Sequence, residues 1–191
     1  FSFNKISIIQ NTNLNTLRFL KTLDLSHNQI YSIDFEFQFQ FLRHLNLSFN
    51  NLSEIRIIQT FEAIVINNNQ ITSLKYLSGN NYMNDNSLRE MPCIMIDNSI
   101  TPTEIYLFNN KIDIIREKCL SHGLPTDINI LDLRNNAIKT IEPLAFKALY
   151  VLNSLDLSKN KISSLEKIVF RDLKDLKALN LSSNLLYIIK S

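Results

Sequence analysis

Residues 152–162 read LNSLDLSKNKI, and the same spacing of apolar residues and asparagine occurs at six other places in the 191-residue chain. The shared pattern is L-x-x-L-x-L-x-x-N-x-[IL], with Phe, Ile or Pro replacing some of the leucines. The other matches lie at residues 20–30, 42–52, 61–71, 102–112, 128–138 and 176–186. Seven matches to one eleven-position pattern indicate an internal repeat, so the fold is expected to be a stack of similar units.

Within each match, the segment x-L-x-L-x alternates apolar and outward positions. Alternation places two apolar side chains on one face of a short strand and three other side chains on the opposite face. Stacked copies of this strand form a parallel sheet with its apolar face turned inward. The second half of the unit has a spacing of its own, in which apolar residues return at Leu165, Phe170 and Leu173 and, one unit earlier, at Ile141, Phe146 and Leu149.

The asparagine of the pattern requires a structural explanation, because a buried amide without a partner costs several kcal/mol at worst. Its side chain is expected to pair with backbone groups that become free where the strand turns away. Repetition from unit to unit would produce an asparagine ladder. The predicted ladder residues are Asn4, Asn28, Asn50, Asn69, Asn110, Asn136, Asn160 and Asn184.

These features are the sequence signature of leucine-rich repeats, and the 24-residue phase with an inward Phe resembles the extracellular subfamily found in Toll-like receptors and insect leucine-rich immune proteins. The resemblance implies an α/β repeat fold, a curved horseshoe with a parallel β-sheet on its concave face and a mostly irregular or short-helical convex side. It is specific for the fold but carries little information on function, because this repeat serves many unrelated receptors.

A single array over residues 1–191 is expected. Residues 1–6 (FSFNKI) align with residues 47–52 (LSFNNL), so the chain opens in the middle of a unit, and it closes soon after Leu186. Solenoid ends need polar caps that shield the core, and neither end carries one. We therefore expect the chain to be an excerpt of a longer array.

Residues 75–101 interrupt the pattern with the turn signal GNN at 79–81 and a polar run at 84–87. The flanking matches start 41 residues apart, which fits two units. One interpretation is a degenerate repeat with Met83, Leu88 and Cys93 pointing inward, although Asn86 and Met91 fit the pattern badly. The other is an insertion loop that leaves the solenoid, and the sequence does not choose between them.

The two cysteines lie in this interruption and in the unit that follows it. In a secreted protein, a disulfide between Cys93 and Cys119 would pin the irregular segment, and the alternative is a pair of buried free thiols that act as small apolar residues. Cys119 and His122 have a C-x-x-H spacing, but a structural zinc site needs four ligands and no second pair exists. No metal or cofactor is expected.

The outward strand positions are small and polar in the end units and more apolar in the middle. The candidate ligand-binding patch on the concave face consists of Ala63, Val65, Tyr106, Phe108 and Ile130, with a rim of Asn67, Glu104 and Arg134. An exposed apolar patch with a polar rim is common in binding surfaces, and Tyr, Phe and Arg are enriched in interfaces. The alternatives are that residues 75–101 cover the patch, or that it has no function.

Three N-x-[ST] sequons predict glycosylation at Asn46, Asn51 and Asn180 if the chain is secreted. The repeat itself favours N-L-S in the strand, so two of the three arise almost automatically. Glycans on Asn46 and Asn180 would occupy the concave face toward both ends and leave the central patch open.

Charge and motif content argue against several function classes. Twenty basic and eighteen acidic residues give a net charge of +2. The basic residues of 159–177 are interleaved with acids, and no aromatic stacking residues accompany them, so nucleic-acid binding is not expected. Two glycines cannot supply a phosphate loop, and no hydrolase or zinc-protease motif occurs. No apolar run approaches the roughly 18–20 residues that cross a bilayer, so membrane attachment would come from parts outside this segment.

The resemblance implies a non-catalytic recognition ectodomain, extracellular and of innate-immune or receptor type. Such a domain would bind a protein or microbial ligand through its concave face and would form homo- or heterodimers. Two alternatives remain open at this stage. One is a cell-adhesion or guidance protein built from the same repeats, and the other is an intracellular interaction scaffold with reduced thiols and no glycans.

Overall fold

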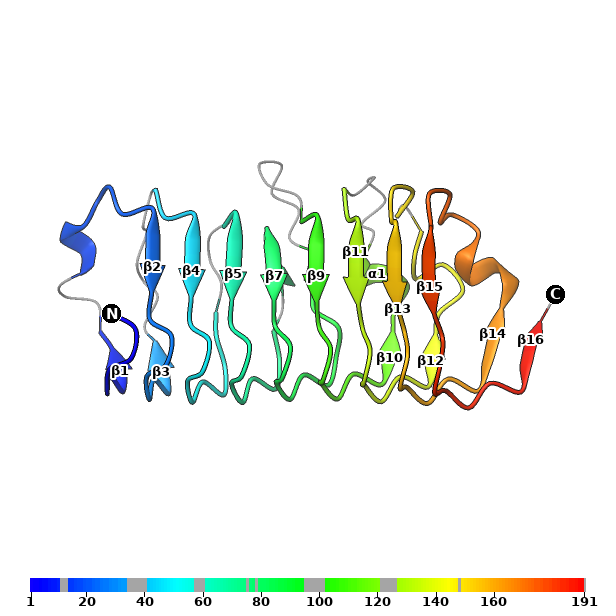
Figure 1. Cartoon of the computed structure of the whole chain (residues 1–191), viewed down its shortest axis with the longest axis horizontal. Helices are drawn as coiled ribbons and strands as arrows, with labels where there is room; N and C mark the ends of the chain where they lie inside the picture. The colour runs from blue at the N-terminus through cyan, green and yellow to red at the C-terminus, as the bar shows by residue number, and fades with distance from the viewer. Residues whose placement is uncertain are drawn as a thin grey trace.

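The computed structural model describes residues 1–10, 14–33, 41–56, 61–74, 76–77, 79–94, 102–120, 127–147 and 149–190. These residues form a solenoid in which successive units lie side by side, with β1 and β16 at opposite ends (Figure 1). Each unit contributes one strand to a long sheet and then returns along the other side of the stack.

Among the described residues, the long sheet contains eight parallel strands whose spatial order follows the chain, and each strand is joined to the next through the return side. Its strands are β2 (Thr22–Asp24), β4 (His44–Asn46), β5 (Ala63–Val65), β7 (Asn80–Tyr82), β9 (Glu104–Tyr106), β11 (Ile130–Asp132), β13 (Ser154–Asp156) and β15 (Ala178–Asn180). The register follows the repeat, so that Leu131 pairs with Ile105 on one side and Leu155 on the other.

The return side of the solenoid is built from short elements. Four two-stranded parallel sheets pair β1 (Ile8–Ile9) with β3 (Ser32–Ile33), β6 (Tyr76–Leu77) with β8 (Cys93–Ile94), β10 (Ile114–Ile115) with β12 (Thr140–Ile141), and β14 (Ser164–Glu166) with β16 (Ile188–Lys190). The helices among the described residues are η1 (Leu14–Thr16), α1 (Glu117–Leu120) and η2 (Lys167–Phe170). None of them is long and apolar enough to span a membrane.

A single apolar core fills the space between the two sides. Both inward leucines of β11, Leu131 and Leu133, are fully buried, as are Ile138 and Phe146 from the return half of the same unit. The other units repeat this arrangement, except that Asn81 replaces an inward apolar residue in β7 and that Leu179 in the terminal strand β15 is exposed. The parallel-sheet solenoid with very little helix is the fold predicted from the repeat.

The described part of residues 75–101 forms a turn of the solenoid. Strand β7 pairs with β5 on one side and β9 on the other. Met83 and Leu88 are buried in the core, whereas Cys93 is only half-buried. At the entry to β7, Gly79 has φ +63°, and a Cβ there would collide with the carbonyl oxygen of Phe61. Residues 75, 78 and 95–101 lie outside the described part of the chain.

Asn81 occupies an inward position of β7 where the neighbouring strands carry Ile64 and Ile105. Its side chain is completely buried and donates from Nδ2 to the carbonyl oxygen of Gly79. Its Oδ1 has no hydrogen-bond partner among the described residues. An unpaired buried polar atom destabilises a fold by about 1–3 kcal/mol, so Asn81 is less favourable at this position than the isoleucines of the neighbouring strands.

The asparagine that recurs in each repeat forms a ladder of side chain–backbone hydrogen bonds. Asn136 Oδ1 accepts the N–H of Ile112 from the preceding unit at 3.1 Å. Its Nδ2 donates to the carbonyl oxygens of Leu107, also in the preceding unit, and Leu133, each at 3.0 Å. Equivalent bonds are made by Asn28, Asn50, Asn69, Asn86, Asn110, Asn160 and Asn184.

Asn4 differs from the other ladder residues. It is exposed, and its Nδ2 donates to the carbonyl oxygens of Phe1 and Ser2 within its own unit. Asn86 is a ladder residue that the repeat pattern did not identify. Its presence shows that the unit beginning at Gly79 turns in the same way as its neighbours.

The residue before each ladder asparagine adopts a left-handed backbone conformation, with φ between +52° and +56°. These residues are Phe3, His27, Phe49, Asn68, Asp85, Asn109, Asn135, Lys159 and Ser183. Asparagine and aspartate tolerate this region, whereas bulky residues rarely occupy it. In the first three units the aromatic rings at this position stack on one another, with 4.3 Å between successive centroids.

Replacing one ladder residue should therefore have a measurable cost. Asn136→Ala leaves the buried N–H and carbonyl groups around it without partners, and we expect it to reduce the free energy of unfolding by about 1–3 kcal/mol. Lys139→Ala in the same unit is the control, because Lys139 is exposed and should change stability by less than about 0.5 kcal/mol. Equal unfolding midpoints in urea for the two variants would contradict the structural role of the ladder.

Candidate ligand-binding site on the sheet face

The outward side chains of the eight-stranded sheet form a continuous surface, here called the sheet face. It consists of the first and third residues of each strand and the residue two positions after the strand. Strand β7 lies between β5 and β9, so Asn80 and Tyr82 separate Ala63 and Val65 from Glu104 and Tyr106. Strand β7, which the repeat pattern does not mark, therefore divides the predicted patch into two parts.

Tyr82 lies at the centre of the predicted patch, in contact with Tyr106 and Glu104. The rings of Tyr82 and Tyr106 stack with 5.1 Å between centroids and an interplanar angle of 12°. Both hydroxyl groups donate to Glu104 Oε2, at 3.2 Å from Tyr82 and 3.4 Å from Tyr106. Partial burial is the main cause that raises the pKa of both phenols above the usual value of 10.0, and the negative charge of Glu104 is the second. Both side chains therefore stay protonated and act as hydrogen-bond donors at neutral pH.

Phe108, two residues after β9, and Arg134, two residues after β11, form a second pair on the sheet face. The Arg134 guanidinium carbon lies 4.5 Å from the centroid of the Phe108 ring, which is a cation–π contact. Arg134 Nε also lies 3.3 Å from Asp132 Oδ2, and the Arg134 backbone N–H donates to Asp132 Oδ1 at 3.1 Å. The long Arg134 side chain is thus held by a ring and a carboxylate rather than extending freely into solvent.

Asp132 is the most buried charged group of the sheet face, with 8% of its surface exposed. Burial raises the pKa of its carboxyl group above the usual 3.8, and the nearby charge of Asp156 acts in the same direction. The hydrogen bond from the Arg134 N–H and the Arg134 charge oppose this shift without cancelling it. Asp132 therefore holds the backbone and the guanidinium of Arg134 in place and also adds negative charge to the sheet face.

The other predicted patch residues, Ala63, Val65, Asn67 and Ile130, are half-buried on the sheet face. Nearer the ends of the sheet, some outward residues are less exposed to solvent than their polar character would predict. Ser26, Ser48 and Ser158 are buried, and their N–H groups donate to the Asp or Asn two residues earlier. The exposed part of the face is therefore narrower at these strands.

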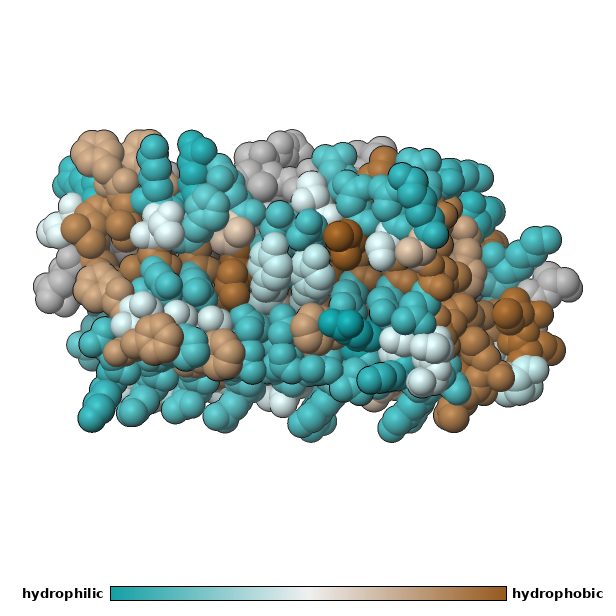
Figure 2. Space-filling view, viewed as in Figure 1, coloured by the Kyte–Doolittle hydropathy of each residue, from teal (hydrophilic) through white to brown (hydrophobic). Residues whose placement is uncertain are grey.

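The sheet face differs in charge from the molecule as a whole. Besides His44, it carries four carboxylates, those of Asp24, Glu104, Asp132 and Asp156, and one guanidinium, that of Arg134. The chain nevertheless has a net charge of +2. Figure 2 shows the face as largely hydrophilic, with hydrophobic areas at both ends and smaller ones in the middle. The positive charge therefore lies elsewhere on the surface.

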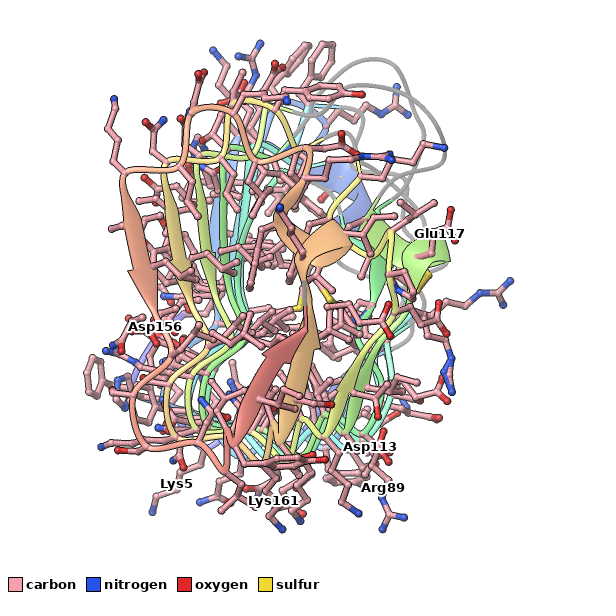
Figure 3. All side chains as sticks on the ribbon, turned by 90° about the vertical axis from the view of Figure 1, so that its right-hand side faces the viewer. Lys5, Arg89, Asp113, Glu117, Asp156 and Lys161 are labelled. Carbon is pink, nitrogen blue, oxygen red and sulfur yellow. A yellow bond between two sulfur atoms is a disulfide. The ribbon has the colours of Figure 1, made fainter. Side chains whose placement is uncertain are left out.

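Viewed along the solenoid, the labelled charged residues lie on three different sides (Figure 3). Asp156 lies on the side of the long sheet, and Glu117 lies on the return side. Lys5, Arg89 and Lys161 lie at the edge where the chain turns from the long sheet to the return side, here called the turn edge. A ligand that approaches the sheet face therefore meets mainly carboxylates, aromatic rings and neutral polar groups.

The three sequons differ in exposure. Asn51 is exposed at the turn after β4, away from the sheet face, and Asn180 is exposed on β15. Asn46 is half-buried, and its Oδ1 accepts both the N–H and the hydroxyl of Ser48. Because a glycan must be attached to an accessible amide nitrogen, Asn51 and Asn180 are better placed as acceptors than Asn46.

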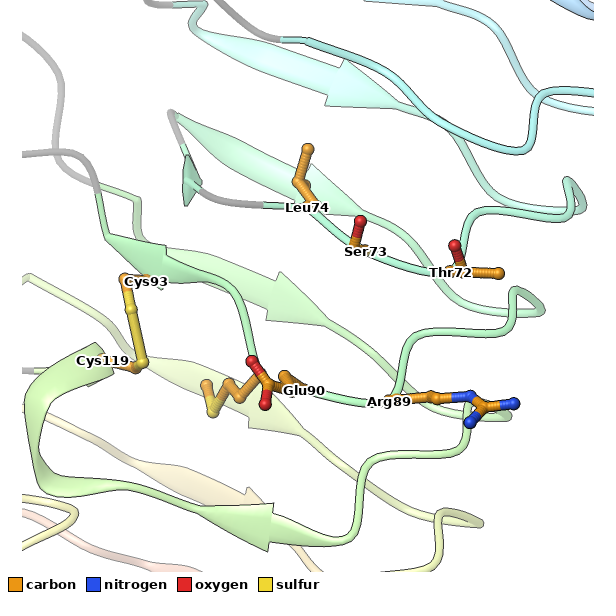
Figure 4. A pocket seen from close by; sticks show the side chains of 8 residues that line it. Thr72, Ser73, Leu74, Arg89, Glu90, Cys93 and Cys119 are labelled. Atoms are coloured by element: carbon orange, nitrogen blue, oxygen red, sulfur yellow. A yellow bond between two sulfur atoms is a disulfide. The ribbon is translucent and has the colours of Figure 1, made fainter.

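Cys93 and Cys119 form a disulfide on the return side, joining β8 to α1 (Figure 4). A cavity of about 640 Å³ lies beside it, with Leu74, Met91 and both cysteines in its wall. The described residues contain no group of three or more His, Cys, Asp or Glu side chains that could hold a metal ion. His122 lies outside the described part of the chain.

Tyr82 could not be assigned to the outward face from the sequence, because Asn81 occupies an inward position that is apolar in the other strands. The alternation of apolar and polar residues, which marks a strand, is lost at this point. The spacing of Met83, Asn86 and Leu88 still matches the second half of the repeat pattern, and it was the only available signal.

The raised pKa of Asp132 generates a pH-dependent prediction. An acid whose pKa is higher in the folded than in the unfolded state stabilises the fold most at low pH, and this contribution is lost as the pH rises through the folded-state pKa. Asp132→Asn removes the titration, and asparagine already accepts the equivalent N–H at Asn46 and Asn180. The stability of the wild type relative to the variant should fall as the pH rises through 3.8 and the higher folded-state value. Urea unfolding at several pH values measures this difference, and a relative stability that rises with pH would contradict it.

The chain was compared with known protein families and structures. Two family models match, one described as "Leucine rich repeat" over residues 126–186 and one as "Leucine Rich repeats (2 copies)" over residues 19–60. No curated protein matches the chain. Between the two matched regions, β5, β7 and β9 continue the same sheet, so the repeat fold extends through residues that neither model covers.

Among solved structures, the chain is similar to one described as the crystal structure of a TLR13–ssRNA13 complex, with a TM-score of 0.77 and 24% sequence identity. The similarity covers 93% of this chain and 27% of the chain in that structure, so this chain spans about a quarter of that length. Together with the repeat pattern and the asparagine ladder, these matches show that the chain carries leucine-rich repeats and has the fold of the Toll-like receptor chain in that structure.

Proposed function

We propose that the chain is a non-catalytic recognition domain that binds a protein ligand through the centre of the sheet face. The observation that carries this proposal is the set of Tyr82, Tyr106 and Phe108 on neighbouring units, where the fold requires no aromatic residue. Outward strand positions in the end units are filled by Ser, Thr, Asp and Asn without loss of the fold. The central aromatic residues therefore have a reason other than packing in the core.

The aromatic side chains are held in place before any ligand arrives. Glu104 accepts from both tyrosine hydroxyls, and Arg134 covers Phe108 while its backbone is tied to Asp132. Binding loses less conformational entropy when interface side chains are already ordered. Tyr, Phe and Arg side chains of this kind are common anchors in protein interfaces.

The similar solved structure is a complex with single-stranded RNA, which raises a second candidate ligand class. The charge of the sheet face favours a protein over RNA in this chain. Four carboxylates against one guanidinium repel a phosphate backbone, and RNA binding is normally supported by a groove of basic residues. The Lys residues at the turn edge do not alter the charge of the sheet face.

We further propose that the domain works outside the cell, in a receptor of innate-immune type. The Cys93–Cys119 disulfide supports this, because disulfides persist mainly in oxidising compartments. The exposed sequons at Asn51 and Asn180 and the fold resemblance to Toll-like receptor ectodomains support it too. A cell-adhesion protein is the alternative within the same compartment, and self-association without ligand would favour it.

The binding site can be tested without knowing the natural ligand. Peptides selected from a random phage-displayed library on the wild-type domain serve as probes. Tyr106→Ala combined with Phe108→Ala should weaken their binding by about tenfold or more, because two interface anchors are removed. Thr22→Ala combined with His44→Ala at the end of the same sheet is the control and should bind like the wild type. Equal affinities for all three proteins would place the binding site elsewhere.

The extracellular setting has its own test. Peptide mass spectrometry of the natively produced protein, kept unreduced and treated with glycosidase in labelled water, reports glycan occupancy and the state of both cysteines. We expect the disulfide intact and glycans on Asn51, Asn180 or both. Bare asparagines together with two free thiols would contradict the extracellular proposal and favour an intracellular scaffold.

A further inference from the structure

Glu104 lies at the centre of the sheet face between residues that cannot neutralise it. Tyr82 and Tyr106 donate to its Oε2, and both are neutral. Its neighbours at the same strand position are Asn80 and Ile130, and Asn80 Oδ1 already accepts the N–H groups of Thr103 and Glu104. Among the described residues, no Lys, Arg or His side chain forms an ion pair with Glu104.

Two other carboxylates close to the sheet face are paired with cationic side chains. Asp132 is paired with Arg134 at 3.3 Å. Glu62, just before β5, is paired with Arg43 at 2.7 Å and lies 3.7 Å from His44. Asp156, like Glu104, is hydrogen-bonded to neutral groups, the Nδ2–H of Asn180 and the N–H of Ser158. Glu104 differs from all three in the two tyrosine hydroxyls that donate to it, and among the described residues it has no cationic partner.

The chain itself shows which group suits such a site. Arg134 is bound one strand away by the same combination, an aromatic ring and a carboxylate, with 4.5 Å to the Phe108 centroid and 3.3 Å to Asp132. A planar guanidinium can stack on a ring and donate to a carboxylate at the same time, which an ammonium does less well. Hydrogen bonds between charged groups are also stronger than those between neutral groups.

We propose that Glu104, Tyr82 and Tyr106 form the binding site for an arginine side chain of the protein ligand. This inference rests on the proposed function of the sheet face and adds the chemistry of the partner. The partner is a basic segment whose arginine provides the charge that the face lacks. The excess of carboxylates over the whole sheet face attracts such a segment and orients it during association.

The test uses the peptides selected on the wild-type domain. Arginine should be enriched in them above its frequency in the library. A parallel selection on Glu104→Gln should yield binding peptides without this enrichment, because the amide keeps the hydrogen-bond acceptor for the tyrosines and removes the charge. Glu62→Gln is the matched control, since Glu62 already has Arg43 as a partner, and selection on it should still enrich arginine.

A double-mutant cycle makes the assignment quantitative. We expect Glu104→Gln to weaken binding of the best arginine peptide by about tenfold or more, and replacement of that arginine by glutamine in the peptide to have a similar effect. The two changes together should weaken binding little more than either one alone, because they remove the same contact. Additive losses would overturn the assignment of arginine to Glu104.

The remaining outcomes separate this inference from the proposed function. If no peptide binds the wild type better than it binds the variant with Tyr106→Ala and Phe108→Ala, the proposed function fails. If peptides bind at the aromatic site without enriched arginine, only the present inference fails. Competition of a short single-stranded RNA with an arginine peptide for the wild-type domain would also overturn it, because the site would then accept a polyanion.

Discussion

The asparagine ladder is the interaction on which the rest of the structure depends. At every turn the chain leaves the sheet, and its strand carbonyls and the next N–H groups would be buried without partners. Asn136 and its equivalents satisfy groups in their own unit and in the preceding one, so each side chain joins two units as well as closing a turn. The left-handed residue before the asparagine is part of the same turn. Regular stacking follows, and with it the straight columns of the sheet face.

The unit around β7 shows how far the repeat can deviate while the ladder is kept. Asn81 replaces an apolar core residue and leaves its Oδ1 unpaired, and Gly79 is required by the close approach of the Phe61 carbonyl. Asn86 still makes the full set of ladder bonds, and the Cys93–Cys119 disulfide links the return side of this unit to the next. This unit also supplies Tyr82, so a core position with an unpaired amide oxygen lies next to the centre of the candidate site.

Much of the fold was predictable because the pattern occurs seven times, so that its inward and outward positions can be identified even where single residues deviate from it. The inward and outward positions of β9, β11 and β13 follow from alternation alone. The same reasoning failed at β7, where Asn81 breaks the alternation and Asn86 follows Asn69 after only 17 residues. The sequence also places three serines at outward positions without indicating how exposed they are. Ser26, Ser48 and Ser158 are buried, and their N–H groups donate to the Asp or Asn two residues earlier.

The sequence by itself determined the parallel sheet, most of its core and the outward positions of Tyr106 and Phe108, because these depend on spacing within one unit. Only the tertiary structure decided which outward residues touch. Tyr82 and Tyr106 are 24 positions apart in the chain, and stacking of their units brings their rings to 5.1 Å and both hydroxyls to Glu104. Arg134 reaches Phe108 in the same way. Contacts between units depend on the length and course of the return segments, which the repeat pattern does not specify.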